Sequence, residues 1–187
     1  MGSEMCIRDS KDTQIITEVN NVTDFNSVKT MDKDEAKIAG LYNVIGYDLD
    51  DRYIAALKKM SINGDLIKKV ADDFTIVYTP LHGTGNIPAR RVLKELGFKN
   101  VYVVPEQEKP DPDFTTLEYP NPEDPKAFTL ALKLAKEKNA DIILATDPDA
   151  DRLGVYAKDS KTGEYVSFTG NMSGMLIAEY LLSQRRE

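Results

Sequence analysis

Three aspartates alternate with other residues in the segment Asp147–Arg152, which reads DPDADR. Asp147, Asp149 and Asp151 are close enough in sequence for their carboxylates to repel one another unless a cation neutralises them. A looping chain can turn alternate side chains towards one centre, and carboxylate oxygens are ligands that Mg²⁺ and Ca²⁺ prefer. The pattern therefore predicts a metal site. An acidic, solvated turn is the plainer alternative, but such a turn needs no alternation of this kind after an apolar strand.

Two other kinds of acidic site share features with this segment: an EF-hand calcium loop and the active site of a phosphatase with an aspartyl nucleophile. An EF-hand calcium loop needs glycine at its sixth position and glutamate at its twelfth, where this chain has Arg152 and Lys158, so that interpretation is excluded. A phosphatase with an aspartyl nucleophile also has an apolar strand running into Asp-x-Asp. It needs a later pair of acidic residues, and the acidic residues beyond the segment stand singly: Asp159, Glu164, Glu179 and Glu187. This alternative stays open only if part of the protein is missing.

Short apolar runs and amphipathic stretches alternate along the part of the chain that must position the aspartates. The apolar runs at 74–78, 101–104 and 141–146 are typical of buried strands. Between them, apolar residues recur at helical spacing over 89–96 and 127–135, and Gly97 is a suitable helix stop. The next helix has a capping residue, Asp124, and a proline at its first position, Pro125. This strand–helix order predicts right-handed crossovers and parallel strands.

The remaining segments complete the predicted fold. A helix is expected over 48–60, a hairpin over 153–157 and 165–168, and a last helix over 171–186. The fold class is therefore α/β, with three α/β/α layers, a small and mostly parallel sheet, and a C-terminal β-hairpin followed by a helix. Ligands of such sheets bind beyond the carboxyl ends of the strands. The loop TPLHGTGN and the aspartate segment both leave such ends, so we expect them at one edge.

Three segments in a fixed order carry a resemblance to a known family. TPLHGTG follows a strand, YPNPEDP precedes a helix, and DPDADRLGV follows another strand. Together they resemble the second domain of the α-D-phosphohexomutases, the family of phosphoglucomutases and phosphomannomutases. The resemblance covers residues 48–170. The TPLHG form is similar to the bacterial members.

The resemblance implies a phosphotransferase with four domains around one cleft. A phosphoserine of the first domain exchanges its phosphoryl group with a hexose phosphate, and a bisphosphate intermediate links hexose 1-phosphate to hexose 6-phosphate. By similarity, Asp147, Asp149 and Asp151 hold Mg²⁺. Arg152 matches the family's arginine near the phosphate and substrate, where one guanidinium group can donate hydrogen bonds to two phosphate oxygens at once. Arg152 could instead simply neutralise the aspartates.

This chain departs from the family pattern because it contains no serine loop of the Thr-Ala-Ser-His-Asn-Pro kind. It also has no sugar-reading Gly-Glu-Glu loop and no Arg-x-Ser-Gly-Thr phosphate loop. We therefore expect no catalytic residue in this chain, and no mutase activity from it alone. The expected organisation is an expression leader at 1–10, the end of domain I and a linker at 11–47, the metal-binding domain II at 48–170, and the opening helix of domain III at 171–187.

The last helix is apolar on two sides. Met172, Met175 and Leu176 share one face, while Ile177 and Tyr180 share another with Leu181. A helix of this kind expects two partners, so self-association through it is a further expectation.

Composition limits the class of protein. Of 187 residues, 41% are hydrophobic and 29% charged, which is typical of a globular protein. The net charge of −7 argues against binding to nucleic acid or an anionic membrane. One cysteine, Cys6, excludes an internal disulfide, and one histidine, His82, excludes a two-histidine metal site. No apolar run is long enough to span a membrane, and the simplest compartment is the cytoplasm.

Three smaller expectations concern the turn residues and the N-terminal segment. His82 lies on the expected ligand edge, and we favour a structural role for it over one in the cleft. Gly83 and Gly85 are interpreted as serving a tight strand-to-helix turn rather than a phosphate cradle. Residues 12–19 alternate weakly and are interpreted as a strand, and residues 32–39 as a short helix. If the chain is not part of an enzyme, an acidic cation-binding or interaction module is the alternative.

Overall fold

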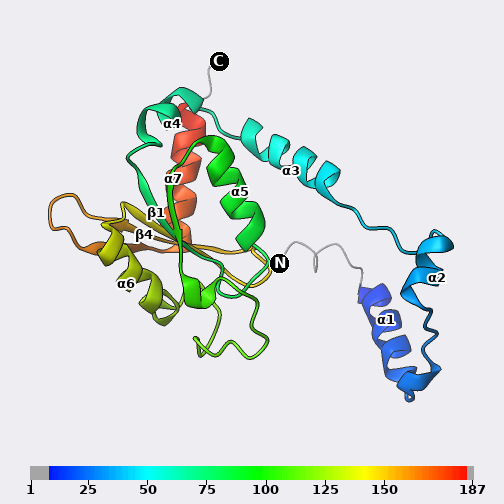
Figure 1. Cartoon of the computed structure of the whole chain (residues 1–187). Coiled ribbons are helices and arrows are strands. Elements are labelled where there is room, and N and C mark those ends of the chain that lie inside the picture. The colour runs from blue at the N-terminus through cyan, green and yellow to red at the C-terminus, as the bar shows by residue number, and fades with distance from the viewer. Residues whose placement is uncertain (1–8, 185–187) are drawn as a thin grey trace. The chain divides into compact units, whose positions relative to one another are not determined.

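A computed structural model describes residues 9–184 of the chain (Figure 1), which divides into two units, residues 1–45 and 46–187. Cys6 and most of the expected leader lie outside the described residues. In the first unit, α1 spans Asp9–Asn21, a 3₁₀ turn spans Phe25–Ser27, and α2 spans Lys33–Ile38.

The strand expected over residues 12–19 is wrong, because these residues belong to α1. Ile15, Ile16 and Val19 are spaced along one side of this helix and are exposed. A helix pairs its backbone groups within the segment, whereas a strand needs a neighbour. No other segment among residues 9–45 forms a strand, so the weak alternation of residues 12–19 had no partner with which to build a sheet.

The short helix expected near residues 32–39 is confirmed as α2. Asp32 caps it by accepting hydrogen bonds from the backbone N–H groups of Asp34 and Glu35, at 2.8 and 3.2 Å. The hydrogen bonds from Glu35 and Asp34 hold the pKa of the Asp32 carboxyl below its ordinary value. Gly40 ends the helix with a φ of +71°, a conformation that glycine adopts without strain.

The second unit is built on a five-stranded sheet with the order β2-β1-β3-β4-β5. The strands are β1 (Thr75–Thr79), β2 (Asn100–Val103), β3 (Ile142–Thr146), β4 (Leu153–Lys158) and β5 (Tyr165–Phe168). β1 pairs parallel with β2 and with β3, while β3 pairs antiparallel with β4, and β4 with β5. The α/β fold is confirmed: three parallel strands carry a C-terminal hairpin, and the whole sheet is mixed.

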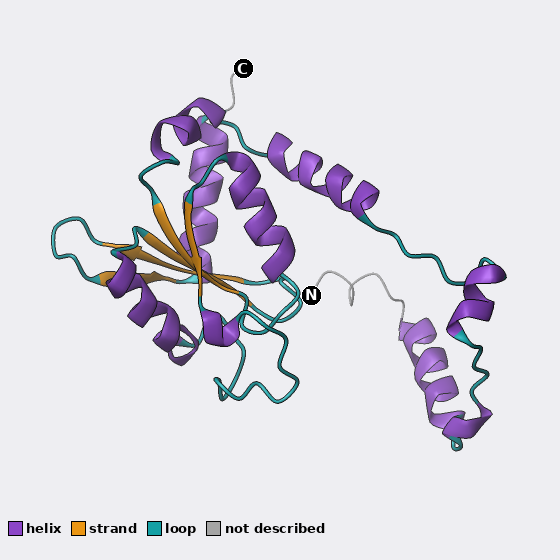
Figure 2. Cartoon of the chain, viewed as in Figure 1, coloured by secondary structure: helices purple, strands orange, loops and turns teal. Residues whose placement is uncertain are grey.

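Helices lie on both faces of this sheet, as Figures 1 and 2 show. The crossover from β1 to β2 and the crossover from β2 to β3 run in opposite directions across the sheet. Because such crossovers are right-handed, α5 and α6 lie on opposite faces. α6 contacts β1 and β3 on one face, and α7 contacts β4 and β5 on the other. The helices of this unit are α3 (Tyr47–Lys59), α4 (Gly64–Val70), α5 (Asn86–Leu96), α6 (Thr129–Lys138) and α7 (Gly170–Ser183), with 3₁₀ turns at Pro105–Gln107 and Pro125–Phe128.

The main core lies between α6 and the sheet. Ala131 and Ala135 face inwards from α6 and are fully buried, which lets the helix approach the sheet closely. The aromatic ring of Phe128 packs against that of Tyr156, with ring centroids 4.6 Å apart. Buried residues of this cluster also come from the strands and loops: Val77, Leu81, Val104, Ala127, Ala140, Ile143 and Ala145.

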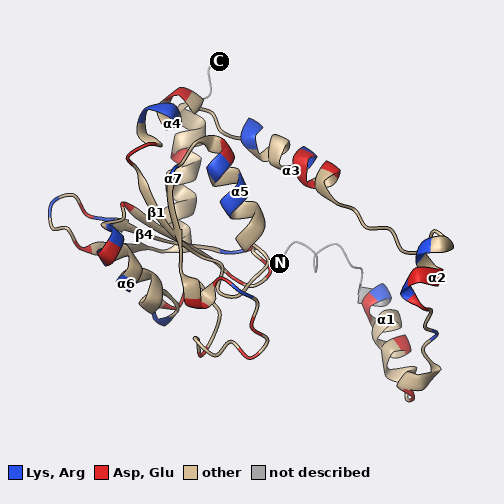
Figure 3. Cartoon of the chain, viewed as in Figure 1, with Lys and Arg blue, Asp and Glu red and all other residues tan. Residues whose placement is uncertain are grey.

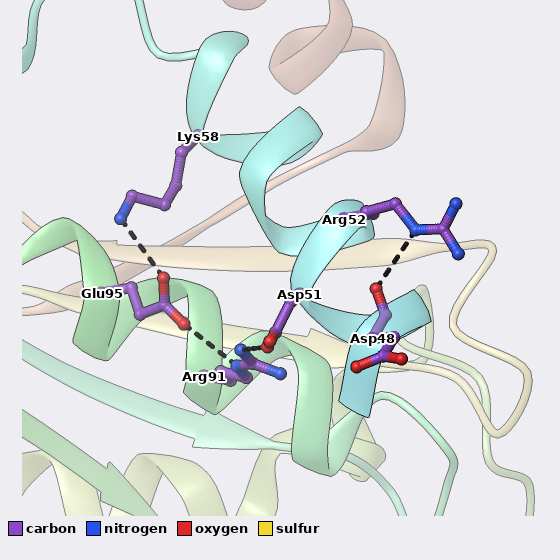
Figure 4. Close-up of polar contacts among 6 residues, drawn as sticks. All are labelled: Asp48, Asp51, Arg52, Lys58, Arg91 and Glu95. Carbon is purple, nitrogen blue, oxygen red and sulfur yellow. Dashed lines mark hydrogen bonds and ion pairs between the residues drawn. The ribbon is translucent and has the colours of Figure 1, made fainter. Parts of the chain in front are cut away.

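α3 packs on α5 through one buried side chain and a row of ion pairs (Figure 4). Ile54 is only 2% exposed at this contact. Arg91 of α5 pairs with Asp51 of α3 and with Glu95, which also accepts from Lys58 at 3.2 Å. The hydrogen bonds from Arg91 and Lys58 hold the pKa of the Glu95 carboxyl below its ordinary value. Arg91 thus serves a helix–helix surface.

Several boundaries follow the sequence closely, and one helix was missed. Asp124 accepts a hydrogen bond from the Lys126 N–H at 2.9 Å, so it is a capping residue as predicted, but it caps the 3₁₀ turn Pro125–Phe128 that leads into α6. Gly97 ends α5 with a φ of +108°. α4 was not expected, because the Asn63-Gly64 pair indicated only a break in the chain.

Among the helices of residues 9–184, none has both the length and the apolar character that a membrane span requires.

Candidate metal centre

The aspartate segment starts from a fixed point at the end of β3. Thr146 closes this strand, and its hydroxyl lies 2.8 Å from the Tyr78 hydroxyl of β1, so the two strand ends are joined. Burial raises the pKa of Tyr78, and the hydrogen bond with Thr146 partly offsets that rise. Asp147 follows directly and is only 7% exposed.

Two hydrogen bonds wrap the segment around Asp147. The backbone N–H of Ala150 donates to the Asp147 carbonyl at 3.0 Å, which closes a turn. The backbone N–H of Arg152 donates to Oδ1 of the Asp147 side chain, also at 3.0 Å. Ala150 has a φ of +61°, an uncommon conformation for a residue other than glycine. The segment is therefore a defined loop in which the backbone returns towards its first aspartate.

The three carboxylates gather at one point, as the sequence predicted. An oxygen from each of Asp147, Asp149 and Asp151 lies within 4.8 Å of the others, and the latter two aspartates are exposed. Burial raises the pKa of the Asp147 carboxyl. The hydrogen bond from Arg152 opposes the rise, while the Asp151 and Asp149 carboxylates add to it. The buried carboxyl of Asp147 thus lies beside two exposed carboxylates, and both its burial and its neighbours disfavour its charged form.

This donor set fits a hard divalent cation. In an octahedral Mg²⁺ site the metal–oxygen distances are about 2.0–2.1 Å, so opposite ligands are about 4 Å apart. The carboxylate oxygens all lie within 4.8 Å of one another, so a single ion is within reach of all three side chains. A cation would also relieve the repulsion within the cluster, and the two exposed aspartates leave room for further ligands such as water or phosphate oxygens.

Arg152 lies beside the cluster with its side chain 54% exposed. Its Nε is 3.8 Å from Oδ2 of Asp147 and 3.9 Å from Oδ1 of Asp151, so it makes ion pairs with both but no short hydrogen bond. The guanidinium is therefore both a partial counter-charge and a donor that remains accessible from solvent. The arrangement accommodates either role that the sequence suggested.

The loop between β1 and α5 lies against the aspartate segment, as expected for loops that leave neighbouring parallel strands. Thr84 donates twice to the carbonyl oxygen of Pro148, from its backbone N–H at 2.8 Å and from its hydroxyl at 3.0 Å. Gly83 passes so close that a Cβ atom there would lie 2.5 Å from the Cα of Pro148. Two segments far apart in sequence are thereby joined at the edge of the sheet.

These contacts change the interpretation of the two glycines. Neither Gly83 nor Gly85 has a positive φ; in this turn the positive values belong to Leu81 and His82, at +46° and +65°. The turn itself closes by a hydrogen bond from the Gly83 N–H to the Pro80 carbonyl at 2.8 Å. The glycines are needed because the aspartate segment approaches closely, not because the backbone requires a conformation special to glycine.

His82 is buried beneath the long loop that follows β2. Its Nδ1 lies 2.8 Å from the Lys109 carbonyl oxygen, which accepts only, and its Nε2 lies 2.7 Å from the Thr116 hydroxyl. The ring also meets Phe114 edge-on, with centroids 6.0 Å apart. Since both ring nitrogens are engaged by the loop, the structure supports the structural role that the sequence analysis favoured.

Sequence reasoning missed Thr84 and the residues that hold the loop after β2. Gln107 is fully buried, where its Oε1 accepts from the Thr79 hydroxyl at 2.6 Å. Its Nε2 donates to Thr116 at 3.3 Å. These partners are 28 and 9 residues away from Gln107, so no local spacing rule finds them. The length of the loop after β2 was the one available signal.

A family model and two relatives from bacteria all match this chain as part of a phosphoglucomutase or phosphomannomutase. Residues 51–162 match the family described as phosphoglucomutase/phosphomannomutase, alpha/beta/alpha domain II. The chain is 40% identical over 143 residues to a probable phosphomannomutase of Haemophilus influenzae, covering 76% of this chain and 28% of that protein. It is 32% identical over 195 residues to a phosphoglucomutase of Staphylococcus aureus strain MRSA252, covering 91% of this chain and 35% of that protein.

A solved structure shows the same fold. It comes from Thermus thermophilus and is described as a candidate phosphomannomutase. It aligns with a TM-score of 0.57 at 24% identity, covering 74% of this chain and 29% of that one. The chain thus spans about a third of the length of the curated relatives described above.

Proposed function

Because this chain belongs to the phosphoglucomutase/phosphomannomutase family, we propose that it is the metal-binding part of a phosphohexomutase. Such an enzyme interconverts hexose 1-phosphate and hexose 6-phosphate through a phosphoserine and a bisphosphate intermediate. The family match spans the aspartate segment, and it favours this function over an aspartyl phosphatase or a separate cation-binding module.

Mg²⁺ is the ion that we propose Asp147, Asp149 and Asp151 to bind. A single observation carries this proposal: three carboxylate oxygens lie within 4.8 Å of one another at the end of a core strand, and one of them belongs to a buried side chain. A divalent cation bound there would neutralise charge on a phosphoryl group in transfer. The chain's own contribution is to hold the three oxygens together before the cation arrives.

Arg152 is the proposed substrate-binding residue of this chain. Its half-exposed guanidinium lies next to the carboxylates, where it can donate to two phosphate oxygens at once. Such a contact would orient a phosphate near the cation site without taking part in bond breaking. The reacting phosphoserine is proposed to belong to another part of the enzyme.

The proposed organisation places domain II of the family at residues 48–170, with the end of domain I at 11–47 and the opening helix of domain III at 171–187. Support for the central assignment comes from the match at 51–162 and from the sheet within that range. The substrate is proposed to be a hexose phosphate, and the cytoplasmic location expected from the sequence stays a prediction.

Self-association through α7 remains part of the proposal. Its apolar side chains are exposed on more than one side, and Figure 3 shows the helix as almost uncharged beside the charged surfaces of α3 and α5. An exposed helix of this composition is typical of a surface that another element covers.

Activity of the complete gene product is the direct test of the proposed function. We would sequence the gene on both sides of this segment, express the whole reading frame, and assay glucose 1-phosphate and mannose 1-phosphate in the presence of Mg²⁺. We expect turnover that is lost when Asp147, Asp149 and Asp151 are all changed to asparagine. The 187-residue chain alone should show none. Equal turnover by the triple variant would contradict the metal assignment.

A further inference from the structure

The residues between the aspartates are held by the turn between β1 and α5. Pro148 separates the first two aspartates, and both hydrogen bonds from Thr84 end on its carbonyl oxygen, at 2.8 and 3.0 Å. Two donors on one carbonyl occupy both of its lone pairs. Gly83 lies against the same residue, with no space for a side chain between them. Pro148 is therefore fixed from one side by two successive residues of the turn.

Ala150, which separates the second and third aspartates, meets the next residue of the same turn. A Cβ atom on Gly85 would lie 3.1 Å from the Cβ of Ala150, and 2.7 Å from Oγ1 of Thr146. The side chain of Ala150 thus points towards Gly85, and its backbone has the uncommon positive φ described above. Both residues that alternate with the ligands are packed on the turn.

We infer that Gly83, Thr84 and Gly85 are positioning residues for the cation site: they hold Pro148 and Ala150 so that the alternate aspartates project together towards the cation. This inference rests on the proposed function, because it concerns the same site. The three residues carry no carboxylate, and the hydroxyl of Thr84 is engaged by the Pro148 carbonyl, so each acts through the aspartate segment.

The physical reason lies in the repulsion among the carboxylates. Without a cation, three neighbouring negative charges favour a segment that opens and separates them. Contacts to the intervening residues oppose that opening and keep the oxygens within 4.8 Å of one another. Less reorganisation is then needed when the cation binds, so the affinity for the cation is higher.

Thr84 provides the cleanest variant, because it is exposed and its hydroxyl can be removed with little change of shape. We would titrate the ¹⁵N-labelled 187-residue chain with MgCl₂ and follow the amide signals of residues 149–151 by NMR. Loss of one hydrogen bond in Thr84→Val should raise the Kd for Mg²⁺ about fivefold. Thr84→Ser keeps the hydroxyl and should restore the Kd of the unsubstituted chain.

Thr129 offers a matched control. It is also an exposed threonine whose hydroxyl donates to a backbone carbonyl, that of Lys126 at 2.8 Å, at the start of α6. Thr129→Val should leave the Kd for Mg²⁺ unchanged. Gly85→Ala is the second test variant. Its new methyl group would lie 2.7 Å from Oγ1 of Thr146, 2.8 Å from the Tyr78 hydroxyl and 3.1 Å from the Cβ of Ala150, so it disturbs the contact that holds the aspartate segment and should also raise the Kd. The spectra and melting temperatures report whether each variant is folded.

The variants of Thr84 test the positioning role, and the unsubstituted chain tests the metal site itself. If the unsubstituted chain binds Mg²⁺ and Thr84→Val binds it equally well, the turn has only a structural role and the inference is overturned. The same holds if Thr84→Ser fails to restore the affinity. If Mg²⁺ leaves the signals of residues 149–151 unchanged in the unsubstituted chain, the proposed metal site itself is overturned, and the inference with it.

Discussion

Asp147 carries an electrostatic conflict that a cation would relieve. Its carboxyl group is buried beside the carboxylates of Asp149 and Asp151, and burial raises its pKa. The folded protein therefore disfavours the charged form of Asp147. Side chains that serve a ligand often reduce stability when the ligand is not bound.

This conflict predicts opposite effects on stability and on binding. Asp147→Asn removes one of the repelling charges but keeps an oxygen that accepts from the Arg152 N–H. We expect a higher melting temperature than the unsubstituted chain in EDTA, and no further rise on addition of Mg²⁺. Asp113→Asn, at an exposed site on another loop, should change neither. A lower melting temperature of Asp147→Asn in EDTA would contradict this account.

His82 is expected to affect stability and not the metal. Asparagine tolerates the positive φ of this position but is too short to reach both Lys109 and Thr116, so His82→Asn isolates the hydrogen bonds of the ring. The free energy of unfolding, measured in urea, should fall by about 1–3 kcal/mol. An unchanged stability, or a loss of Mg²⁺ binding alone, would place His82 in the cleft instead.

At the residue scale, the sequence predicted the part of the site that is local. The alternation of Asp147, Asp149 and Asp151 is visible without a structure, and the three carboxylates do meet. The contact of Thr84 with Pro148 was not predictable, because it joins residues 64 apart and depends on two loops leaving adjacent parallel strands. The glycines beside Thr84 were recognised, but their reason was found only in the structure.

β4 passes very close to the loop that precedes α6. A Cβ atom on Gly154 would lie 2.4 Å from the Pro122 carbonyl oxygen and 2.7 Å from Cζ of Phe128. Gly154→Ala should therefore lower the free energy of unfolding by about 1–3 kcal/mol, because backbone must move to admit the methyl group. Urea unfolding measures this loss.

Gly64 is the matched glycine for this comparison. It begins α4 and has open space around its Cα. Gly64→Ala should leave stability unchanged or raise it by up to about 1 kcal/mol, since alanine favours the helix. Equal losses for the two variants would show that the close approach of β4 to Pro122 contributes nothing.

The contact between α3 and α5 separates apolar from ionic contributions. Ile54 is buried in this contact, so Ile54→Ala should cost about 2–4 kcal/mol of unfolding free energy. The ion pairs of Arg91 are open to solvent, so Arg91→Met should lower the free energy of unfolding by less than Ile54→Ala does. The destabilisation caused by Arg91→Met should also become smaller at high salt, because salt screens ion pairs. A larger loss for Arg91→Met than for Ile54→Ala would contradict this ranking.

At the element scale, prediction succeeded where packing produces a repeating pattern. The parallel strands, α5 and α6 have apolar residues at the expected spacing, because each turns one side towards the interior. Ala131 and Ala135 of α6 are fully buried, whereas Ala89, Val92, Leu93 and Leu96 of α5 are partly buried. The helix α1 was mistaken for a strand and α4 was missed. Residues 11–21 of α1 are all exposed, and within α4 only Ile67 is partly buried, so neither helix buries an apolar stripe. The weak alternation of residues 12–19 then suggested a strand, and the Asn63-Gly64 pair suggested only a break in the chain.

At the scale of the whole molecule, the charge is net negative and its distribution is uneven. Figure 3 shows acidic and basic residues together on α3 and α5, while α7 is largely uncharged. Exposed apolar side chains on α7 include Met175, Ile177 and Leu182. This helix is the most apolar surface element of the second unit.

Self-association should therefore depend on α7. We expect the weight-average mass in sedimentation equilibrium to rise with protein concentration. Met175→Lys should suppress this rise, because it introduces a charge on the exposed face. Ile87→Lys, an equally exposed apolar site on α5, is the control and should not. A mass that stays monomeric at every concentration would remove self-association from the account.

The sequence also predicted the α/β fold of the larger unit, because strand and helix periods alternate along it. Residues 11–47 show no clear repeating apolar pattern, so the sequence predicted no packed fold for the first unit. The family match and the aspartate cluster together support the central claim, a divalent cation held by three aspartates at the end of β3.

A crystal of the chain soaked in Mn²⁺ tests this claim most directly. Mn²⁺ prefers the same oxygen ligands as Mg²⁺ and gives an anomalous signal. We predict an anomalous peak bonded to carboxylate oxygens of Asp147, Asp149 and Asp151. An ordered aspartate loop without such a peak, in a crystal that binds Mn²⁺ elsewhere, would contradict the account.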